Sequence, residues 1–144
     1  MDLNDLYTQV ILEHSRNQEN KKEIDADLHE PGHNPSCGDE IELEIKLDGD
    51  KISDAAFTGH GCAISQASTS IMCDQIKGKT LKEAKEQADI FIRMIRRENV
   101  SDEELEEIGD AAALQNVSNM PARVKCALLA WRTLDEMIKD EEKK

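Results

Sequence analysis

Aromatic side chains are almost absent from this sequence of 144 residues. They make up 3% of it, as one Trp, one Tyr and two Phe. The core therefore has to be built from Leu, Ile, Val, Met and Ala. At 38% hydrophobic residues the chain can bury one core of ordinary size, and we expect a single domain over residues 1–144.

Positive charge is also in short supply. The sequence has 18 Lys and Arg against 31 Asp and Glu, which gives a formal net charge of −13. A nucleic-acid-binding protein needs a basic surface, and an anionic membrane would repel a chain this acidic. We therefore expect neither nucleic acid nor membrane as a partner. The acidity keeps a protein soluble, and it could also steer the chain toward a basic partner.

Long hydrophobic runs are missing as well. No segment approaches the roughly 20 apolar residues of a membrane span, and residues 1–17 lack the basic leader, apolar run and cleavage site of a signal peptide. We expect a cytoplasmic protein. In that reducing compartment cysteines bind metal, react or lie buried more often than they form disulfides. The four cysteines are Cys37, Cys62, Cys73 and Cys126.

The hydrophobic pattern predicts one β-hairpin. Apolar and charged residues alternate over 40–47, and Asp48-Gly49-Asp50 makes a tight turn into a second strand over 51–58. The poorer alternation of that second strand indicates a bulge or twist near Asp54. Residues 17–34 are polar and carry Pro31 and Gly32, so we interpret them as a loop.

The remaining segments have helical spacing and helix-capping residues. The predicted helices cover residues 4–16, the stretch from Cys62 to Gly78, 80–97, 101–109 and a last helix from Pro121, with a short helical piece and a turn over 110–119 and a frayed tail over 139–144. Helices and strands that are segregated in this way predict an α+β fold, in which a small antiparallel sheet packs against several helices.

Three cysteines occupy unusual positions. Cys37 lies in a turn before a strand, Cys62 follows Gly59-His60-Gly61 at a helix start, and Cys126 lies early in the last helix. Helix starts stabilise a thiolate, which is both a metal ligand and a sulfur nucleophile. Asp39 would lie on the same face of a strand as Cys37.

Three thiolates and a carboxylate suit tetrahedral Zn²⁺, with the carboxylate as the most exchangeable ligand. The spacing contains no CxxC pair, however, so it leaves other interpretations open. Cys62 and Cys126 could be small buried hydrophobic residues, and Asp39 could be a solvated residue at a strand end.

The other candidates are weaker. Cys73 lies about 16 Å along the helix from Cys62, too far to share a metal, so we expect a core residue. His60 could assist or replace a ligand, or it could be an exposed loop residue. His29 and His33 flank a Pro-Gly turn near Cys37, where ligation by either is less favoured. His14 is expected at the boundary of the first helix.

Three motifs resemble the cysteine motifs of the IscU/NifU N-terminal family. They are NPSCGD at 34–39, GHGCAIS at 59–65 and RVKCA at 123–127, and the resemblance extends from Leu6 to about Met137. Within this family the chain is similar to the SufU branch, because the stretch between Gly78 and Cys126 is long. In addition, Lys125 stands where IscU scaffolds have a histidine.

The resemblance implies an IscU-like fold and a zinc site made by Cys37, Asp39, Cys62 and Cys126. It also implies that Cys37 accepts persulfide sulfur from a SufS-type cysteine desulfurase, whose histidine replaces Cys37 on the zinc, and that the sulfur continues to a downstream iron–sulfur scaffold. The alternatives are a scaffold that assembles and transfers a [2Fe–2S] cluster on the same residues, and a structural zinc domain. Lys125 favours the sulfurtransferase over the scaffold.

Overall fold

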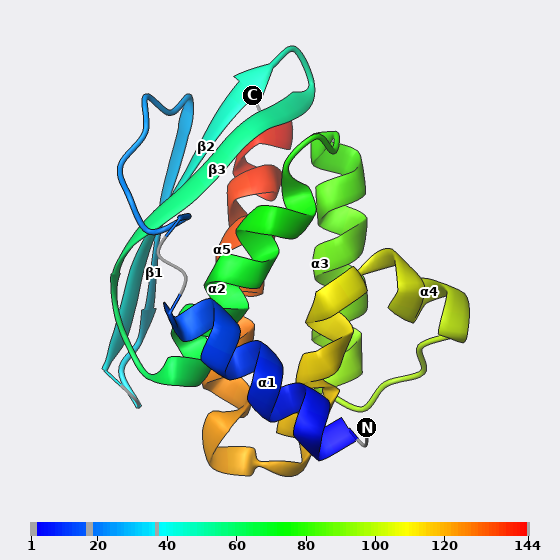
Figure 1. The fold of residues 1–144 in the computed structure, drawn as a ribbon. Coiled ribbons are helices and arrows are strands. Elements are labelled where there is room, and N and C mark those ends of the chain that lie inside the picture. The colour runs from blue at the N-terminus through cyan, green and yellow to red at the C-terminus, as the bar shows by residue number, and fades with distance from the viewer. Residues whose placement is uncertain (1–2, 17–18, 37, 144) are drawn as a thin grey trace.

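An antiparallel three-stranded sheet with helices packed against one face organises the computed structural model, which describes residues 3–16, 19–36 and 38–143 (Figure 1). The sheet has the order β1-β2-β3 and consists of β1 (Leu28–Asn34), β2 (Asp39–Asp48) and β3 (Lys51–His60). The predicted α+β class, with a small antiparallel sheet against several helices, is confirmed.

Strand β1 is a correction to the sequence analysis, which predicts a loop over 17–34. Pro31 cannot donate a hydrogen bond to a neighbouring strand and Gly32 has no side chain, so the two residues conceal the strand pattern. Both are tolerated because β1 lies at the edge of the sheet, where one side of the strand needs no partner. Gly32 is required, because a Cβ there would collide with the hydroxyl of Thr133 on the last helix.

The predicted hairpin of β2 and β3 is confirmed. Gly49 makes the turn with a φ of +66°. Lys46 pairs with Asp54 but Leu47 pairs with Ile52, so the register shifts at the place where the sequence indicates a bulge. The inward-facing apolar residues of β2 are buried against the helices.

Five α-helices and one 3₁₀-helix complete the described chain. They are α1 (Leu3–Arg16), α2 (Ala63–Ile76), α3 (Leu81–Ile95), α4 (Asp102–Glu107), the 3₁₀-helix η1 (Gly109–Asn119) and α5 (Pro121–Glu142). The predicted capping boxes at Thr80 and Ser101 form with both of their hydrogen bonds.

Two predictions in the C-terminal part of the chain are wrong. The stretch 110–119 is a continuous 3₁₀-helix rather than a short helix and a turn. Residues 139–142 are not frayed, since α5 continues to Glu142. The helix persists because Met137 and Ile138 are buried just before this stretch and Lys139 pairs with Asp135 at 2.9 Å.

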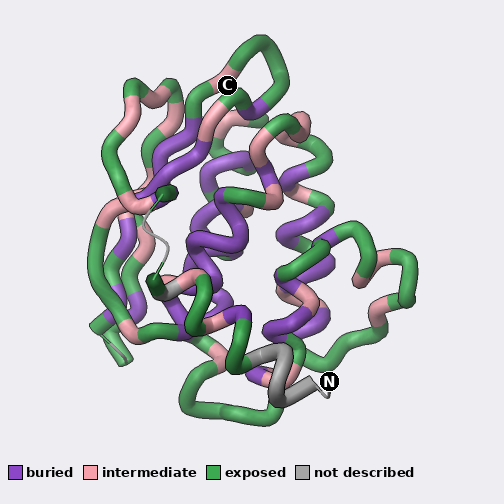
Figure 2. The backbone as a smooth tube through the Cα atoms, in the orientation of Figure 1, coloured by how far each residue is buried: buried purple, intermediate pink, exposed green. Residues whose placement is uncertain are grey.

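The core lies between the sheet and the helices, with the buried parts of the backbone facing inward (Figure 2). Trp131 of α5 stacks on Phe91 of α3 with ring centroids 4.5 Å apart. Helix α2 is buried on nearly all sides, and its buried residues include four with hydroxyl groups, Ser65, Ser68, Thr69 and Ser70. Within the described ranges, none of the helices combines the length and apolar character needed to cross a membrane.

Candidate metal centre

Three of the four predicted ligands meet at one end of the sheet. The ligand atoms of Asp39, Cys62 and Cys126 all lie within 4.8 Å of one another. They come from the first residue of β2, the residue that caps α2 and the second turn of α5. Cys37, the fourth predicted ligand, lies outside the described residues.

Asp39 is completely buried, which contradicts the alternative of a solvated strand-end residue. Its Oδ1 accepts a hydrogen bond from the backbone N–H of Cys62 at 2.9 Å. Its Oδ2 is buried and has no hydrogen-bond partner among the described residues. A buried carboxylate oxygen without a partner is costly, and an adjacent cation would remove that cost.

Cys62 is fixed by the start of α2. It is the N-cap residue in an extended conformation, and its Sγ accepts from the backbone N–H of Ser65 at 3.5 Å. The prediction that the chain turns from strand to helix here is confirmed, although β3 continues through His60. Gly61 leaves space for the neighbouring carboxylate, because a Cβ at this position would lie 2.5 Å from Asp39 Oδ1.

Cys126 is fully buried and belongs to the hydrophobic core. The next residue along α5, Ala127, accepts a hydrogen bond from Ser68 Oγ of α2 at 2.7 Å, so the two helices are joined beside the cysteine. Burial alone would suit a small core residue. The sulfur of Cys126 also lies within 4.8 Å of the ligand atoms of Asp39 and Cys62, which is the proximity that a shared metal ion requires.

The donor set fits a metal ion that accepts both sulfur and oxygen. Zinc ligands bind at about 2.0–2.3 Å, so two ligands of one tetrahedral ion are about 3.6 Å apart. The separations here, all within 4.8 Å, require only small adjustments to meet at one ion. The unpartnered Oδ2 of Asp39 supplies the independent sign that a cation belongs at this place.

The remaining cysteine is part of the core, as predicted. Cys73 is fully buried, and burial raises the pKa of its thiol to about 12. Its thiol is therefore unreactive. Cys62, Cys73 and Cys126 form no disulfide with one another.

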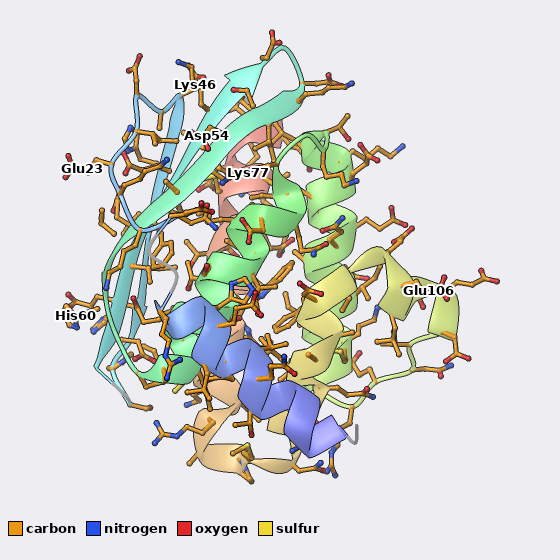
Figure 3. The ribbon with its side chains drawn as sticks, in the orientation of Figure 1. Glu23, Lys46, Asp54, His60, Lys77 and Glu106 are labelled. Atoms are coloured by element: carbon orange, nitrogen blue, oxygen red, sulfur yellow. The ribbon has the colours of Figure 1, made fainter. Side chains whose placement is uncertain are left out.

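The histidines of the sheet lie apart from these donors. The side chain of His60 is 71% exposed on the outer face, and its Nε2 is 3.5 Å from Glu40 Oε2 (Figure 3). His33 pairs with the same carboxylate at 3.6 Å. His29 and His33 lie in strand β1, and the Pro-Gly turn predicted between them is absent, because Pro31 and Gly32 belong to the same strand. His14 is half-buried at the edge of α1, as expected, and its Nδ1 is 3.1 Å from Ser70 Oγ.

Two residues of this region have roles that the sequence analysis does not assign. Gly61, which directly precedes Cys62, makes room for Asp39. Asn34 is opposite Asp39 in the β1–β2 ladder, is 6% exposed, and has an Nδ2 without a hydrogen-bond partner among the described residues. Since Asn34 precedes Pro35, it reads as an ordinary turn residue.

Comparison with known proteins places these features in a family. The model of the NifU-like N terminal domain matches residues 6–140. The chain is 43% identical over 141 residues to the zinc-dependent sulfurtransferase SufU of Bacillus subtilis, which covers 98% of this chain and 95% of that protein. It is 44% identical over 138 residues to the iron-sulfur cluster assembly scaffold protein IscU of Streptococcus pyogenes, with coverages of 95% and 85%.

A solved structure agrees with these sequence matches. The crystal structure of a putative iron-sulfur cluster assembly scaffold protein for the SUF system from Fervidobacterium islandicum superimposes with a TM-score of 0.86 at 41% identity. The superposition covers 94% of this chain and 98% of that one.

Proposed function

The chain belongs to the family of the NifU-like N-terminal domain, and from this premise we propose that it is a zinc-dependent sulfurtransferase of iron–sulfur cluster assembly. In this proposal a SufS-type cysteine desulfurase supplies persulfide sulfur, and a downstream iron–sulfur scaffold receives it. The observation that carries the proposal is the group of Asp39, Cys62 and Cys126, in which the buried Asp39 Oδ2 has no hydrogen-bond partner among the described residues. The likeness to SufU of Bacillus subtilis supports it.

We assign the fourth ligand and the sulfur acceptor to Cys37. Zinc, when bound, holds its cysteine ligands as thiolates at neutral pH. The described residues on either side of Cys37, which are Ser36 and Gly38, are both exposed, whereas Cys126 is fully buried. A partner can therefore reach this turn, and an accessible thiolate is what sulfur exchange requires.

The transfer step needs only groups that the proposal names. The Cys37 thiolate attacks the outer sulfur of the persulfide on the desulfurase cysteine. A sulfur–sulfur bond forms on Cys37, the persulfide bond of the donor breaks, and the donor cysteine leaves as a thiolate. Asp39 and Cys62 contribute through their hydrogen bond, which holds the start of β2 against the start of α2.

A [2Fe–2S] scaffold is the second candidate. Cysteine thiolates serve iron as well as zinc, and the relative from Streptococcus pyogenes is named as a scaffold. Lys125, the residue before Cys126, disfavours this role, because its side chain is a cation at a position where a neutral nitrogen would bind a cluster.

The location of the transferred sulfur tests the proposal. After incubation of the zinc-loaded protein with a SufS-type desulfurase and cysteine, we expect mass spectrometry of its peptides to find one added sulfur on Cys37. Cys37→Ala should abolish the adduct, and Cys73→Ala, the matched removal of a core cysteine, should keep it. Sulfur appearing on Cys126 in the Cys37→Ala protein would overturn the assignment of the acceptor.

A further inference from the structure

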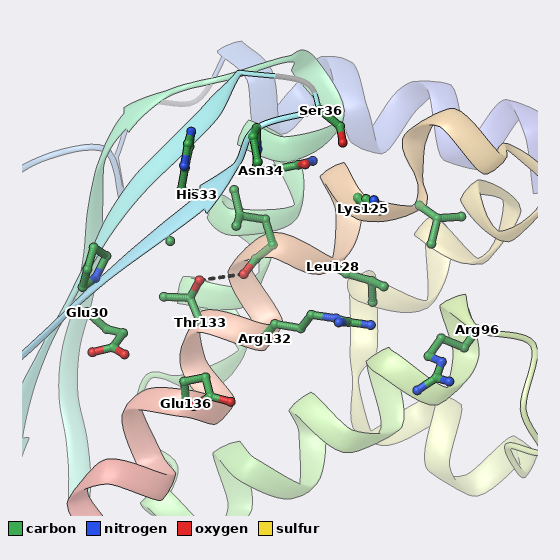
Figure 4. Close-up of a pocket in the computed structure, with 15 residues that line it drawn as sticks. Glu30, His33, Asn34, Ser36, Arg96, Lys125, Leu128, Arg132, Thr133 and Glu136 are labelled. Atoms are coloured by element: carbon green, nitrogen blue, oxygen red, sulfur yellow. Dashed lines mark hydrogen bonds between the residues drawn. The ribbon is translucent and has the colours of Figure 1, made fainter.

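A cavity of about 590 Å³ lies between the edge strand β1 and helix α5 (Figure 4). Its floor is apolar and is made by Val124, Leu128 and Leu129. Figure 4 shows Asn34, Ser36 and Lys125 at one end and Glu30 and Glu136 at the other. A cavity of this size with an apolar floor and a few polar groups is typical of binding sites.

Positive charge gathers on one part of this groove. Lys125 and Arg132 project from the same face of α5, and Arg96 reaches the groove from the end of α3. Arg96 pairs with Glu98 at 3.3 Å. Among the described residues no ion pair involves Lys125 or Arg132. Other described cations, such as Lys82, also lie outside ion pairs, so the distinguishing feature of Lys125 and Arg132 is that both line the same groove.

A buried donor lies at the same end. Asn34 lines the cavity and is 6% exposed, and its Nδ2 has no hydrogen-bond partner among the described residues. A buried amide of this kind needs an acceptor, which can be a water or an atom of a ligand. Together with Lys125, this amide forms a donor pair that suits a carboxylate (Figure 4).

The opposite end of the groove repels anions. Burial raises the pKa of Glu30, and the nearby carboxylates of Asp140 and Glu136 raise it further. Lys125 and Glu136 are eleven residues apart on α5, which corresponds to roughly 16 Å, or about five residues of an extended segment. A bound segment would therefore place its acidic groups beside Lys125 and Arg132 rather than beside Glu30 and Glu136.

We propose that this groove docks the desulfurase through an acidic, partly apolar segment of that enzyme. One carboxylate of the segment binds Asn34 and Lys125, a second acidic group lies beside Arg132 about 10 Å further along α5, and an apolar side chain lies on Leu128. The inference rests on the proposed function and adds to it the surface and the chemistry of docking. Charge complementarity of this kind fixes orientation and accelerates association.

The groove adjoins the Cys37 turn, and this position favours the desulfurase as its occupant. Pro35 and Ser36 line the cavity and directly precede Cys37 in the chain. A protein that delivers sulfur to Cys37 must cover these two residues and hence the adjoining end of the groove. The chain as a whole repels acidic surfaces, but the cations that line this groove attract an acidic segment.

Charge reversal with a matched control tests the inference. The dissociation constant between the zinc-loaded protein and an intact SufS-type desulfurase would be measured by calorimetry for Lys125→Glu and Arg132→Glu. The control is Lys82→Glu, which changes the net charge equally at an exposed position of α3. We expect each groove variant to weaken binding on the order of tenfold and to reduce its salt dependence, and the control to bind like the wild type.

Zinc content and circular dichroism of each variant would be measured to show that it is folded and metal-loaded. Arg132→Gln, which removes the charge without reversing it, should weaken binding to an intermediate degree. Groove variants that bind as tightly as Lys82→Glu would overturn this inference while leaving sulfur transfer to Cys37 intact. The inference would also be overturned if the wild-type groove bound small carboxylates such as succinate while the groove variants kept the wild-type affinity for the desulfurase. A wild-type protein that neither binds the desulfurase nor takes up sulfur would overturn the proposed function as well.

Discussion

Substitution of Gly61 by Ala would test the metal centre without altering a ligand. The new Cβ would lie 2.5 Å from Oδ1 and 3.0 Å from Cγ of Asp39, so the carboxylate has to retreat by roughly 1 Å to reach an ordinary contact distance. Gly61 has no positive φ, and the substitution therefore adds no backbone strain of its own. The perturbation acts on the Asp39 side chain.

The expected effect has two parts. Displacement of Asp39 weakens its hydrogen bond from the Cys62 N–H, and a buried hydrogen bond to a charged group contributes about 1.5–3 kcal/mol. Movement of the carboxylate should also lower zinc affinity, by about 10- to 100-fold if it matches the loss seen when groups supporting a metal ligand are removed.

Chelator competition would measure the zinc affinity of Gly61→Ala, and urea unfolding of the metal-free protein would measure its stability. The control is Gly49→Ala, in the β2–β3 turn. Its φ of +66° makes Ala unfavourable by about 1–2 kcal/mol, but no atom lies within 4 Å of the added Cβ. The control should lose stability and keep its zinc affinity. Wild-type zinc affinity in Gly61→Ala would refute the position assigned to the Asp39 carboxylate.

Two further predictions concern the fold. Trp131→Phe removes the hydrogen bond from Nε1 to Ser68 Oγ at 3.1 Å and leaves a cavity, so unfolding experiments should show a loss of about 1–3 kcal/mol; an unchanged stability would contradict this packing. The Arg93 guanidinium, with the Ser101 N–H, lowers the pKa of Glu104 from 4.5 to about 2. A lowered carboxyl pKa stabilises the fold above the unfolded value, so Glu104→Gln should reduce the loss of stability between pH 4.5 and 2, and an identical pH profile would contradict the pairing.

The sequence predicts those elements whose signals are local. The alternation of Ile41, Leu43 and Ile45 with charged residues specifies β2, and the side chains at Thr80 and Ser101 specify where two helices begin. Each of these signals acts between residues a few positions apart. The fold leaves such local preferences unchanged, and the predicted bounds are close to those observed.

Elements that depend on distant partners escaped the sequence analysis. Strand β1 forms because β2 pairs with it and α5 packs against its face, and Gly32 matters only because Thr133 lies against it. The buried hydroxyl of Ser68 is another case, since its partners are the carbonyl of Ala127 and the indole of Trp131, about 60 positions further along the chain. No spacing rule within α2 could reveal them.

The candidate metal centre depends both on residues that sequence motifs identify and on contacts between distant residues. Motif resemblance singled out Asp39, Cys62 and Cys126, and the fold brings their ligand atoms together. The hydrogen bond that joins Asp39 to Cys62 crosses 23 positions of sequence, and neither its existence nor the space that Gly61 provides follows from spacing. The sequence therefore singled out three side chains that the fold brings together, and the structure adds the contacts that hold Asp39 and Cys62 in place.

Zinc dependence of sulfur uptake is the most direct test of the central claim. Alanine production by a SufS-type desulfurase would be followed with the zinc-loaded protein, with the same protein after chelation and with zinc restored. We predict faster alanine production and sulfur on Cys37 with zinc, loss of both after chelation, and recovery of both on restoration. No acceleration by the zinc-loaded protein, together with stable uptake of iron and sulfide by the metal-free one, would contradict the sulfurtransferase and establish the scaffold.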